Sequence, residues 1–257
     1  MTPVPAWSIP RTAIVTGGGS GIGIAIATRL AQDGASVAIL DRNGDSAVAT
    51  ADAIVADGGT AIGVTVDVSK RDEIEAGVTE VRDRLGAATI LINNAGISPV
   101  SKFLKISQEE FEQVFAVNVR GIFDLCQVVL PDMIEAGWGR IVNISSSSAQ
   151  TGNAGQVHYS ASKGAVISMT RSLAKEFGPK GITVNAVPPS FVDTPALRDA
   201  EDSGMLGGGV EVHEKSTPVR RVGKPDDIAA ACAFFARDDS SYITGQVLGV
   251  NGGRVIV

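Results

Sequence analysis

Short runs of β-branched and other apolar residues alternate along this chain with longer, alanine-rich stretches. The short runs are almost continuously apolar, which is typical of strands buried on both faces of a parallel sheet. Repeated strand–helix alternation predicts right-handed crossovers and therefore a doubly wound α/β fold. We expect strands at Thr12–Thr16, Ser36–Leu40, Ala61–Val66, Thr89–Asn93, Arg140–Ser145, Ile182–Val187 and Gln246–Val250. We expect helices over about 21–33, 44–57, 70–85, 107–136, 156–177 and 225–237.

The 257 residues contain no internal repeat and no linker that would divide them. A single domain of 1–257 is expected, because α/β sheets of this length often form one domain. The segment 190–217 contains Pro195, Gly204 and the run Gly207 to Gly209, and it shows neither strand nor helix periodicity. A segment of this kind in a compact domain predicts a flexible flap over a substrate site.

Charge and cysteine content exclude several classes of function. The formal net charge of −6 argues against nucleic acid as the main partner. Cys126 and Cys232 are far apart and have neither metal-ligand nor redox spacing, which predicts no metal site and a reducing, cytoplasmic location. The first residues lack a signal-peptide pattern, and the apolar run Ile228–Ala236 is much shorter than the roughly 18 residues of a membrane span. No membrane partner is therefore expected.

A glycine-rich string, TGGGSGIG at 16–23, follows the first predicted strand and leads into a predicted helix. Glycines allow a sharp turn there and let a pyrophosphate approach the N-terminus of the helix, where free N–H groups and the dipole favour anions. The spacing is G-x-x-x-G-x-G rather than the common dinucleotide fingerprint. The predicted cofactor contacts in this string are Gly17, Ser20, Gly21, Ile22 and Gly23.

Asp41 ends the second predicted strand, where a carboxylate can accept hydrogen bonds from the ribose hydroxyls of adenosine. The same carboxylate would repel a 2′-phosphate, and Ser20 supplies no cation for one. NAD is therefore the predicted cofactor. Arg42 is the counter-evidence, since a guanidinium beside the site could bind the phosphate of NADP.

Tyr159 and Lys163 are four residues apart in YSASK, which places both side chains on one face of a helix. An ammonium near a phenol favours the phenolate, so Lys163 is expected to lower the pKa of Tyr159 towards the range of an acid–base catalyst. Ser146 follows a predicted strand at the edge where such sheets bind ligands, and its hydroxyl could donate to a substrate oxygen. Its neighbours Ser145, Ser147 and Ser148 leave the choice of serine open.

Together these strings resemble the short-chain dehydrogenase/reductase family, from about Arg11 to the C-terminus. The matching strings are TGGGSGIG at 16–23, Asp67-Val68, NNAG at 93–96, Asn118 in VNV, Ser146, and YSASK at 159–163. The resemblance implies one Rossmann-like domain with a seven-stranded parallel sheet, in a protein that is often a homotetramer.

The resemblance also implies roles for individual residues. Tyr159 would be the general acid/base, with Lys163 lowering its pKa and holding the nicotinamide ribose. Ser146 would orient the reacting oxygen, and Asn118 would sustain a water-linked proton relay through Lys163. Asn93 would brace the sheet. Cofactor contacts would come from Asp67, Val68, Asn94, Tyr159, Lys163, Val192 and Thr194. Ser190 stands where the family usually has glycine, which puts the backbone path near Val192 and Thr194 in doubt, because serine tolerates positive φ poorly.

The implied reaction is hydride transfer between NAD and a secondary alcohol or ketone. One alternative is an NADPH-dependent 3-oxoacyl-thioester reductase, since such members resemble this chain closely and generally use NADPH. A non-catalytic NAD-binding regulatory protein is another, but a pure binder needs no proton relay. The candidate substrate walls are Ile97–Leu104, Ser148, Gln150, Asn153, His158 and the flap, which carries Leu197, Met205, Leu206, Val210, Arg198 and Lys215.

Overall fold

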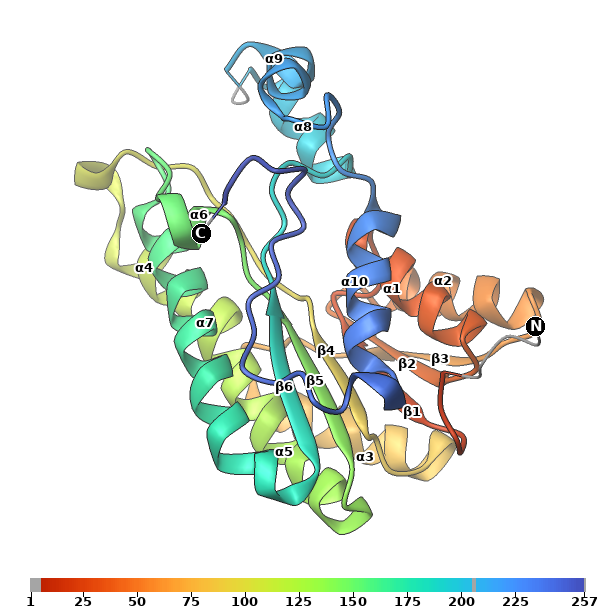
Figure 1. Cartoon of the computed structure of the whole chain (residues 1–257). Coiled ribbons are helices and arrows are strands. Elements are labelled where there is room, and N and C mark those ends of the chain that lie inside the picture. The colour runs from red at the N-terminus through yellow and green to blue at the C-terminus, as the bar shows by residue number, and fades with distance from the viewer. Residues whose placement is uncertain (1–5, 205–206, 257) are drawn as a thin grey trace.

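The computed structural model describes residues 6–204 and 207–256, and it contains a six-stranded parallel sheet in the order β3-β2-β1-β4-β5-β6 (Figure 1). The predicted doubly wound, Rossmann-like α/β fold is therefore confirmed. Neighbouring strands pair in register along their whole shared length, with Thr12 opposite Ser36 and Gly139 opposite Ile182. The strands are β1 (Thr12–Thr16), β2 (Ser36–Asp41), β3 (Thr60–Thr65), β4 (Ile90–Asn93), β5 (Gly139–Ile144) and β6 (Ile182–Val187).

Helices cover both faces of the sheet (Figure 1). On β1, Ala13 and Val15 pack against the helices of one face and Ile14 against those of the other, because successive strand residues point to opposite sides. One core contains α1 (Gly21–Gln32), α2 (Gly44–Ala56) and α10 (Pro225–Ala236), and the other contains α3 (Arg71–Leu85), α5 (Gly121–Ala136) and α7 (Val157–Phe177). The shorter helices are α4 (Gln108–Phe115), α6 (Ser148–Thr151), α8 (Pro195–Asp202) and α9 (Gly209–Ser216).

The seventh predicted strand, Gln246–Val250, is not a full member of the sheet. Val247 and Val250 form only isolated parallel bridges, to Ala186 and Pro189. The Leu248 N–H still donates to the Ala186 carbonyl at 2.9 Å. Beyond Val187 the chain continues with two prolines, which have no N–H to donate, so a regular ladder cannot extend there.

The predicted helix at 107–136 is divided by a π-helical turn, Ala116–Arg120, between α4 and α5. Ser107 caps its start, with the side-chain oxygen accepting from the Glu110 N–H at 3.1 Å. The combined segment Gln108–Ala136 is long and apolar enough to cross a membrane, but half of its apolar window is buried inside the fold, as in a core helix. The π turn places Asn118 in the protein interior, where its side chain is fully buried.

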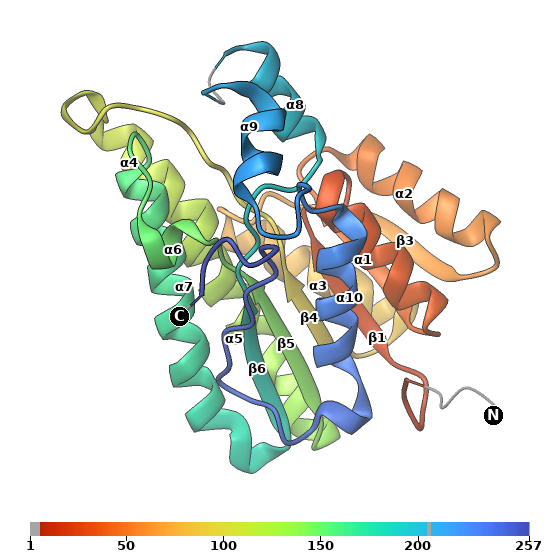
Figure 2. The same ribbon diagram turned by 45° about the horizontal axis from the view of Figure 1, so that its top comes forward.

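The segment 190–217 contains helices α8 and α9, and the expectation of a segment without secondary structure is wrong there. Thr194 caps α8 by accepting from the Leu197 N–H at 3.3 Å, and Pro195 occupies the first turn, where its missing N–H has no cost. Both helices are short and flanked by glycines, so their periodicity was too brief to detect. They lie beyond the end of β6, above the sheet (Figure 2). Met205 and Leu206 lie outside the described residues.

Candidate active site

A crevice opens at the point where the strand order reverses, between β1 and β4. Parallel sheets of this kind bind ligands at such switch points, beyond the carboxyl ends of the strands. A cavity of about 230 Å³ lies there, and it is lined by six of the predicted cofactor contacts. These six residues are Gly17, Ser20, Asp41, Asp67, Val68 and Asn94. The structure thus brings together residues that are far apart in the sequence.

The glycine loop is packed so tightly that it excludes side chains. A Cβ at Gly23 would lie 2.0 Å from the Gly17 carbonyl oxygen. Gly17 itself has φ +61°, a conformation that L side chains rarely adopt, and a Cβ there would lie 2.9 Å from the Ala95 Cα. The loop leads directly into α1, whose first N–H groups lack intrahelical partners. This combination fits a pyrophosphate, since the backbone is free to approach and donate to it.

Asp41 lies at the end of β2 and is held at the edge of the crevice. Its carboxylate oxygens accept from the backbone N–H groups of Gly19 and Asn43, each at 3.0 Å. A carboxylate oxygen can accept more than one hydrogen bond, so Asp41 retains capacity for ribose hydroxyls. Arg42 lines the same cavity, so the counter-evidence for NADP also stands in the structure.

Asp67 is prepared as an acceptor by its neighbours. Its Oδ1 accepts from the Ser69 N–H at 2.9 Å and from the Ser69 hydroxyl at 2.7 Å. Burial acts to raise the pKa of Asp67, but these bonds together with Lys70 and Arg42 hold it below its ordinary value. Ser69 is thus committed to Asp67, and Lys70 takes the N-cap position of α3.

Asn94 ties the glycine loop to β4. Its Nδ2 donates to the carbonyl oxygens of Thr16 and Gly17, each at 3.0 Å. Its backbone N–H donates to the Thr16 hydroxyl at 3.0 Å. The side chain of Asn94 therefore fixes the shape of the cradle. Asn93 braces the sheet as expected, because its Nδ2 donates to Asn143 Oδ1 on β5 at 2.8 Å.

Two serines, Ser146 and Ser98, lie beside the Tyr159 hydroxyl, close enough for their hydroxyls to lower its pKa. Ser146 follows β5, and its Oγ also accepts from the Ser148 N–H at 3.1 Å. Ser145 points elsewhere, because its hydroxyl donates to the Lys163 carbonyl at 2.9 Å. The geometry therefore selects Ser146 from the serine run as the partner of the phenol.

Lys163 and Asn118 lie behind the phenol, next to the cofactor cavity. A Cβ placed on Gly96, which lines that cavity, would lie 3.3 Å from Lys163 Nζ and 3.2 Å from Asn118 Oδ1. Lys163 Nζ donates to the Ile144 carbonyl at 2.8 Å. Asn118 is fully buried in the π turn, where it exchanges hydrogen bonds with the backbone of Ile97 at 2.9 and 3.0 Å.

The expected lowering of the tyrosine pKa by lysine is not present in this structure. Burial raises the pKa of Tyr159 above its ordinary value, and the bonds from Ser146 and Ser98 offset only part of that effect. Lys163 Nζ is 5.9 Å from the centre of the Tyr159 ring and is engaged by the Ile144 carbonyl. Burial also lowers the pKa of Lys163, to about 8. The phenol is therefore protonated at neutral pH, ready to act as an acid.

These pKa shifts predict how the ketone reduction implied by the family resemblance depends on pH. With a pKa of about 8, Lys163 carries its charge at neutral pH and loses it as the pH rises, whereas Tyr159 keeps its proton. We expect kcat/KM for the reduced dinucleotide, which reports the free enzyme, to be level near neutrality and to fall above pH 8. Initial rates across this range, with circular dichroism to verify folding, measure the effect. If kcat/KM stayed level up to the pH at which an ordinary lysine loses its proton, the expectation would be wrong.

The sequence left open the backbone conformation at Ser190 and the cofactor contacts of Val192 and Thr194, which all follow β6. Arg220 is the only non-glycine residue with positive φ in the part of the chain that the structure describes, so Ser190 adopts an ordinary conformation. Thr194 approaches the glycine loop, because a Cβ on Gly21 would lie 3.2 Å from its Cγ2. Val192 is buried and forms a bridge with Gly223. Neither Val192 nor Thr194 lines the cavity described above, so their contact with a cofactor stays a prediction.

The predicted substrate walls divide into exposed and buried residues. Phe103 and Leu104 are strongly exposed, and together they are called the lip below. His158 is buried instead, with Nε2 2.9 Å from Glu110 Oε1 on α4, so its expected place in a substrate wall is wrong. On α8, Arg198 is paired with Asp193 and Glu201, and on α9 Lys215 is paired with Glu211, as expected of solvated ion pairs.

Ser98 and Gln156 also lie at this site, although neither belongs to a sequence motif described above. Gln156 Nε2 donates to Ser98 Oγ at 2.7 Å, and Gln156 accepts in turn from the Asn153 amide. Gln156 stands three residues before Tyr159, one helical turn away, which is the only sequence signal that pointed to it. Among the described residues, no cluster of His, Cys, Asp or Glu could hold a metal ion.

Comparison with known proteins agrees with this geometry. The family described as Enoyl-(Acyl carrier protein) reductase matches residues 17–254. A 3-oxoacyl-[acyl-carrier-protein] reductase from Chlamydia trachomatis is 39% identical, covering 95% of this chain and 97% of the relative. A short-chain reductase protein from Streptomyces niveus is 41% identical, covering 97% and 95%. An acetoacetyl-CoA reductase from Allochromatium vinosum is 40% identical, covering 95% and 98%.

Proposed function

The chain belongs to the short-chain dehydrogenase/reductase family, and we propose that it reduces the ketone of a 3-oxoacyl thioester to the alcohol, with NADH as the cofactor. The observation that carries the proposal is the environment of Tyr159. Its hydroxyl keeps its proton at neutral pH because burial raises its pKa, and it lies beside Ser146 and Ser98. Lys163 and Asn118 connect the same region to the dinucleotide cavity. A protein that only binds a dinucleotide needs no such proton donor.

The residues of the site divide the reaction between them. Ser146 donates a hydrogen bond to the ketone oxygen and aligns it with the phenol. Tyr159 transfers its hydroxyl proton to that oxygen while negative charge develops there. When bound, a reduced nicotinamide would supply the hydride for the carbonyl carbon. The Lys163 ammonium then gives a proton to the phenolate and takes one back from solvent, through water that the Asn118 side chain would hold, so the enzyme regains its starting state. In the oxidative direction every transfer is reversed.

The thioester substrate is supported by the relatives. Those named as 3-oxoacyl-[acyl-carrier-protein] reductase and acetoacetyl-CoA reductase each cover nearly the whole chain. Both names describe reduction of an acyl thioester whose ketone is at the third carbon. The exposed lip of Phe103 and Leu104 agrees with an acyl chain, because it offers apolar surface at the end of the loop that carries Ser98.

The choice of NADH is supported by Asp41. Its carboxylate lines the crevice and is fixed there by two backbone N–H groups. A 2′-phosphate bound beside Asp41 would be repelled by this charge, and turning the carboxylate away would break both hydrogen bonds. Arg42 supports the alternative, NADPH, but its side chain is exposed and has no fixed partner among the described residues. The ordered carboxylate outweighs the exposed guanidinium.

The proposal is tested by comparing NADH and NADPH in the reduction of acetoacetyl-CoA. We expect kcat/KM to be about tenfold or more higher with NADH, because a carboxylate facing a phosphate without a bound cation costs at least about 1.4 kcal/mol. Asp41→Asn keeps the shape but removes the charge, and it is expected to narrow this ratio by raising the value for NADPH.

One control variant and three possible outcomes distinguish the proposed function from its alternatives. Asp45→Asn removes a carboxylate from the first turn of α2, outside the cavity lining, and is expected to leave the ratio unchanged. Higher kcat/KM with NADPH would overturn the cofactor proposal. Faster turnover of simple ketones than of the thioester would instead support a secondary alcohol dehydrogenase, and no turnover of any ketone would support the non-catalytic protein.

A further inference from the structure

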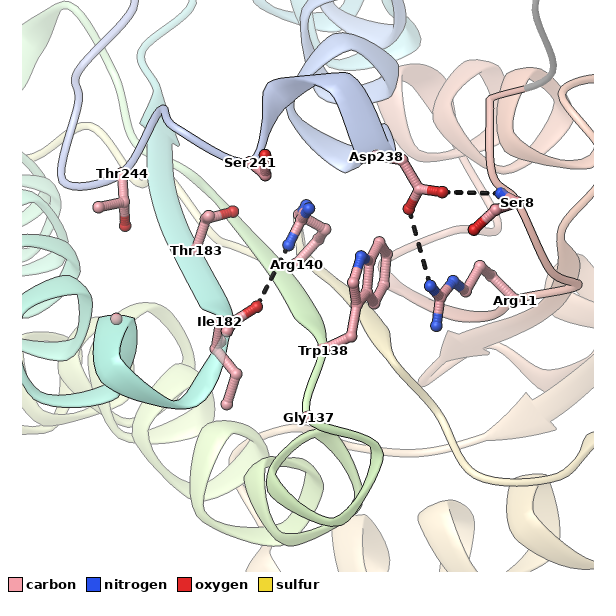
Figure 3. A pocket seen from close by; sticks show the side chains of 12 residues that line it. Ser8, Arg11, Gly137, Trp138, Arg140, Ile182, Thr183, Asp238, Ser241 and Thr244 are labelled. Carbon is pink, nitrogen blue, oxygen red and sulfur yellow. Dashed lines mark hydrogen bonds and ion pairs between the residues drawn. The ribbon is translucent and has the colours of Figure 1, made fainter.

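A second cavity, of about 390 Å³, is lined by the residues drawn in Figure 3. The dinucleotide cleft lies beyond the carboxyl ends of the strands, whereas this cavity opens at their amino ends. It lies where strands begin: Arg11 precedes β1, Arg140 is the second residue of β5, and Thr183 is the second residue of β6. Asp238 and Ser241, which follow α10, close another side. Four segments that are distant in the sequence thus meet at a place that the proposed reaction does not use.

The cavity has an excess of positive charge. Trp138 lies between two guanidinium groups, with Arg11 Cζ 3.6 Å and Arg140 Cζ 4.3 Å from the ring centroid. Asp238 is the only carboxylate among the lining residues, and it forms an ion pair with Arg11 at 3.7 Å. Burial and the charge of Arg11 lower the pKa of Arg140 to about 10, with Asp238 acting in the opposite direction, so Arg140 is still charged at neutral pH.

Several polar atoms at this cavity lack hydrogen-bond partners within the described residues. Thr183 Oγ1 is buried and unpartnered, and so is Arg11 Nε. Arg140 donates through Nε to the Arg237 carbonyl at 3.2 Å and through Nη1 to the Gly139 carbonyl at 3.0 Å, which leaves Nη2 uncommitted. Figure 3 shows the Thr183 hydroxyl pointing toward the Arg140 side chain, with Ser241 on the same side. Asp238 Oδ1 is a buried acceptor without a hydrogen-bond partner at the same cavity, 3.7 Å from Arg11 Nη2. Buried polar atoms without protein partners are costly, so they call for a ligand or for ordered water.

We propose that this cavity binds a phosphate group, either as inorganic phosphate or as a phosphate monoester, between Arg140 Nη2 and the hydroxyls of Thr183 and Ser241. A tetrahedral oxyanion can accept from donors that approach from several sides, as these do, whereas a planar carboxylate matches a single fork. One monoanion would also balance the two guanidinium groups against the single carboxylate. The cavity is large enough to admit the organic part of a monoester.

The test is to titrate the full-length protein with inorganic phosphate and to measure its melting temperature at each phosphate concentration. Saturating oxidised dinucleotide is present throughout, so that phosphate cannot act through the glycine loop, and chloride of equal ionic strength is the reference. We expect a saturable rise of the melting temperature with phosphate, because a ligand that binds only the folded state stabilises it. Thr183→Val, which keeps the volume, is expected to raise the half-saturating concentration about tenfold, the usual effect of losing a hydrogen bond to a charged group.

Thr89→Val is the matched control, because Thr89 is also buried at the start of a strand but does not line the cavity. It is expected to titrate as the wild type does, while Arg140→Met is expected to lose the saturable response. Glycerol phosphate distinguishes the source: tighter binding than inorganic phosphate indicates a monoester. A response equal to that of chloride, or equal titration of the Thr183→Val and Thr89→Val variants, would show a water-filled cavity and overturn the proposal.

Discussion

Tyr159→Phe is expected to reduce kcat by about 100- to 10,000-fold, the usual contribution of a positioned acid–base group. The phenylalanine ring fills the same space beside Ser146 and Ser98, so only the transferable proton is lost. Dinucleotide affinity is expected to change little, because no bond holding the glycine loop involves Tyr159. Stopped-flow reduction and dinucleotide titration by fluorescence measure the two quantities separately.

The other tyrosine of the chain provides the control. Tyr242 is fully exposed, and Tyr242→Phe removes the same hydroxyl without entering either cavity. It is expected to turn over as the wild type does. If Tyr159→Phe kept wild-type kcat, the phenol would not be the proton donor, and the proposed mechanism would fail even if the cofactor still bound.

Gly23→Ala is expected to weaken dinucleotide binding by at least about tenfold, because binding sites built on close backbone approach lose affinity when that approach is displaced. The added Cβ would meet the Gly17 carbonyl oxygen at 2.0 Å and Asn94 Nδ2 at 2.8 Å, so the loop must move away from both. That movement breaks the bond from Asn94 to Gly17 and reshapes the cradle. Isothermal titration calorimetry with NADH measures the loss.

Gly164→Ala is the matched substitution for this test. Gly164 lies inside α7, and nothing stands within 4 Å of a Cβ placed there. Alanine in a helix interior is favoured over glycine by about 1 kcal/mol, so the variant is expected to be at least as stable as the wild type and to bind NADH equally. Unchanged affinity in Gly23→Ala would mean that the cofactor approaches the loop from elsewhere.

The sheet was predictable because buried parallel strands have an unmistakable composition. Ile90, Leu91 and Ile92 are fully buried, and each predicted strand from β1 to β6 agrees with the structure to within a residue or two. The edge segment 246–250 failed because its pairing depends on Pro188 and Pro189 of a neighbour that lies far away in the sequence. Helices α8 and α9 failed because short helices are defined by caps such as Thr194 rather than by a repeating apolar face.

The site was predictable wherever a motif specified backbone geometry, as in the glycine loop. It was less so where a side chain could choose between partners. The sequence could not tell that Ser145 would bond to Lys163 and leave Ser146 to the phenol. It also indicated the wrong direction for the pKa of Tyr159, because burial depends on the packed surroundings and cannot be inferred from a four-residue spacing.

The stretch 94–98 makes cofactor affinity and reaction rate difficult to adjust independently. Asn94 latches the glycine loop, the Ile97 backbone anchors Asn118, and Ser98 contacts the phenol. A substitution in this stretch is therefore expected to change both dinucleotide binding and proton transfer at Tyr159. Substitutions that change the substrate are therefore expected at the lip of Phe103 and Leu104 and on α8 and α9. Surface changes there leave the contacts of Asn94, Ile97 and Ser98 intact.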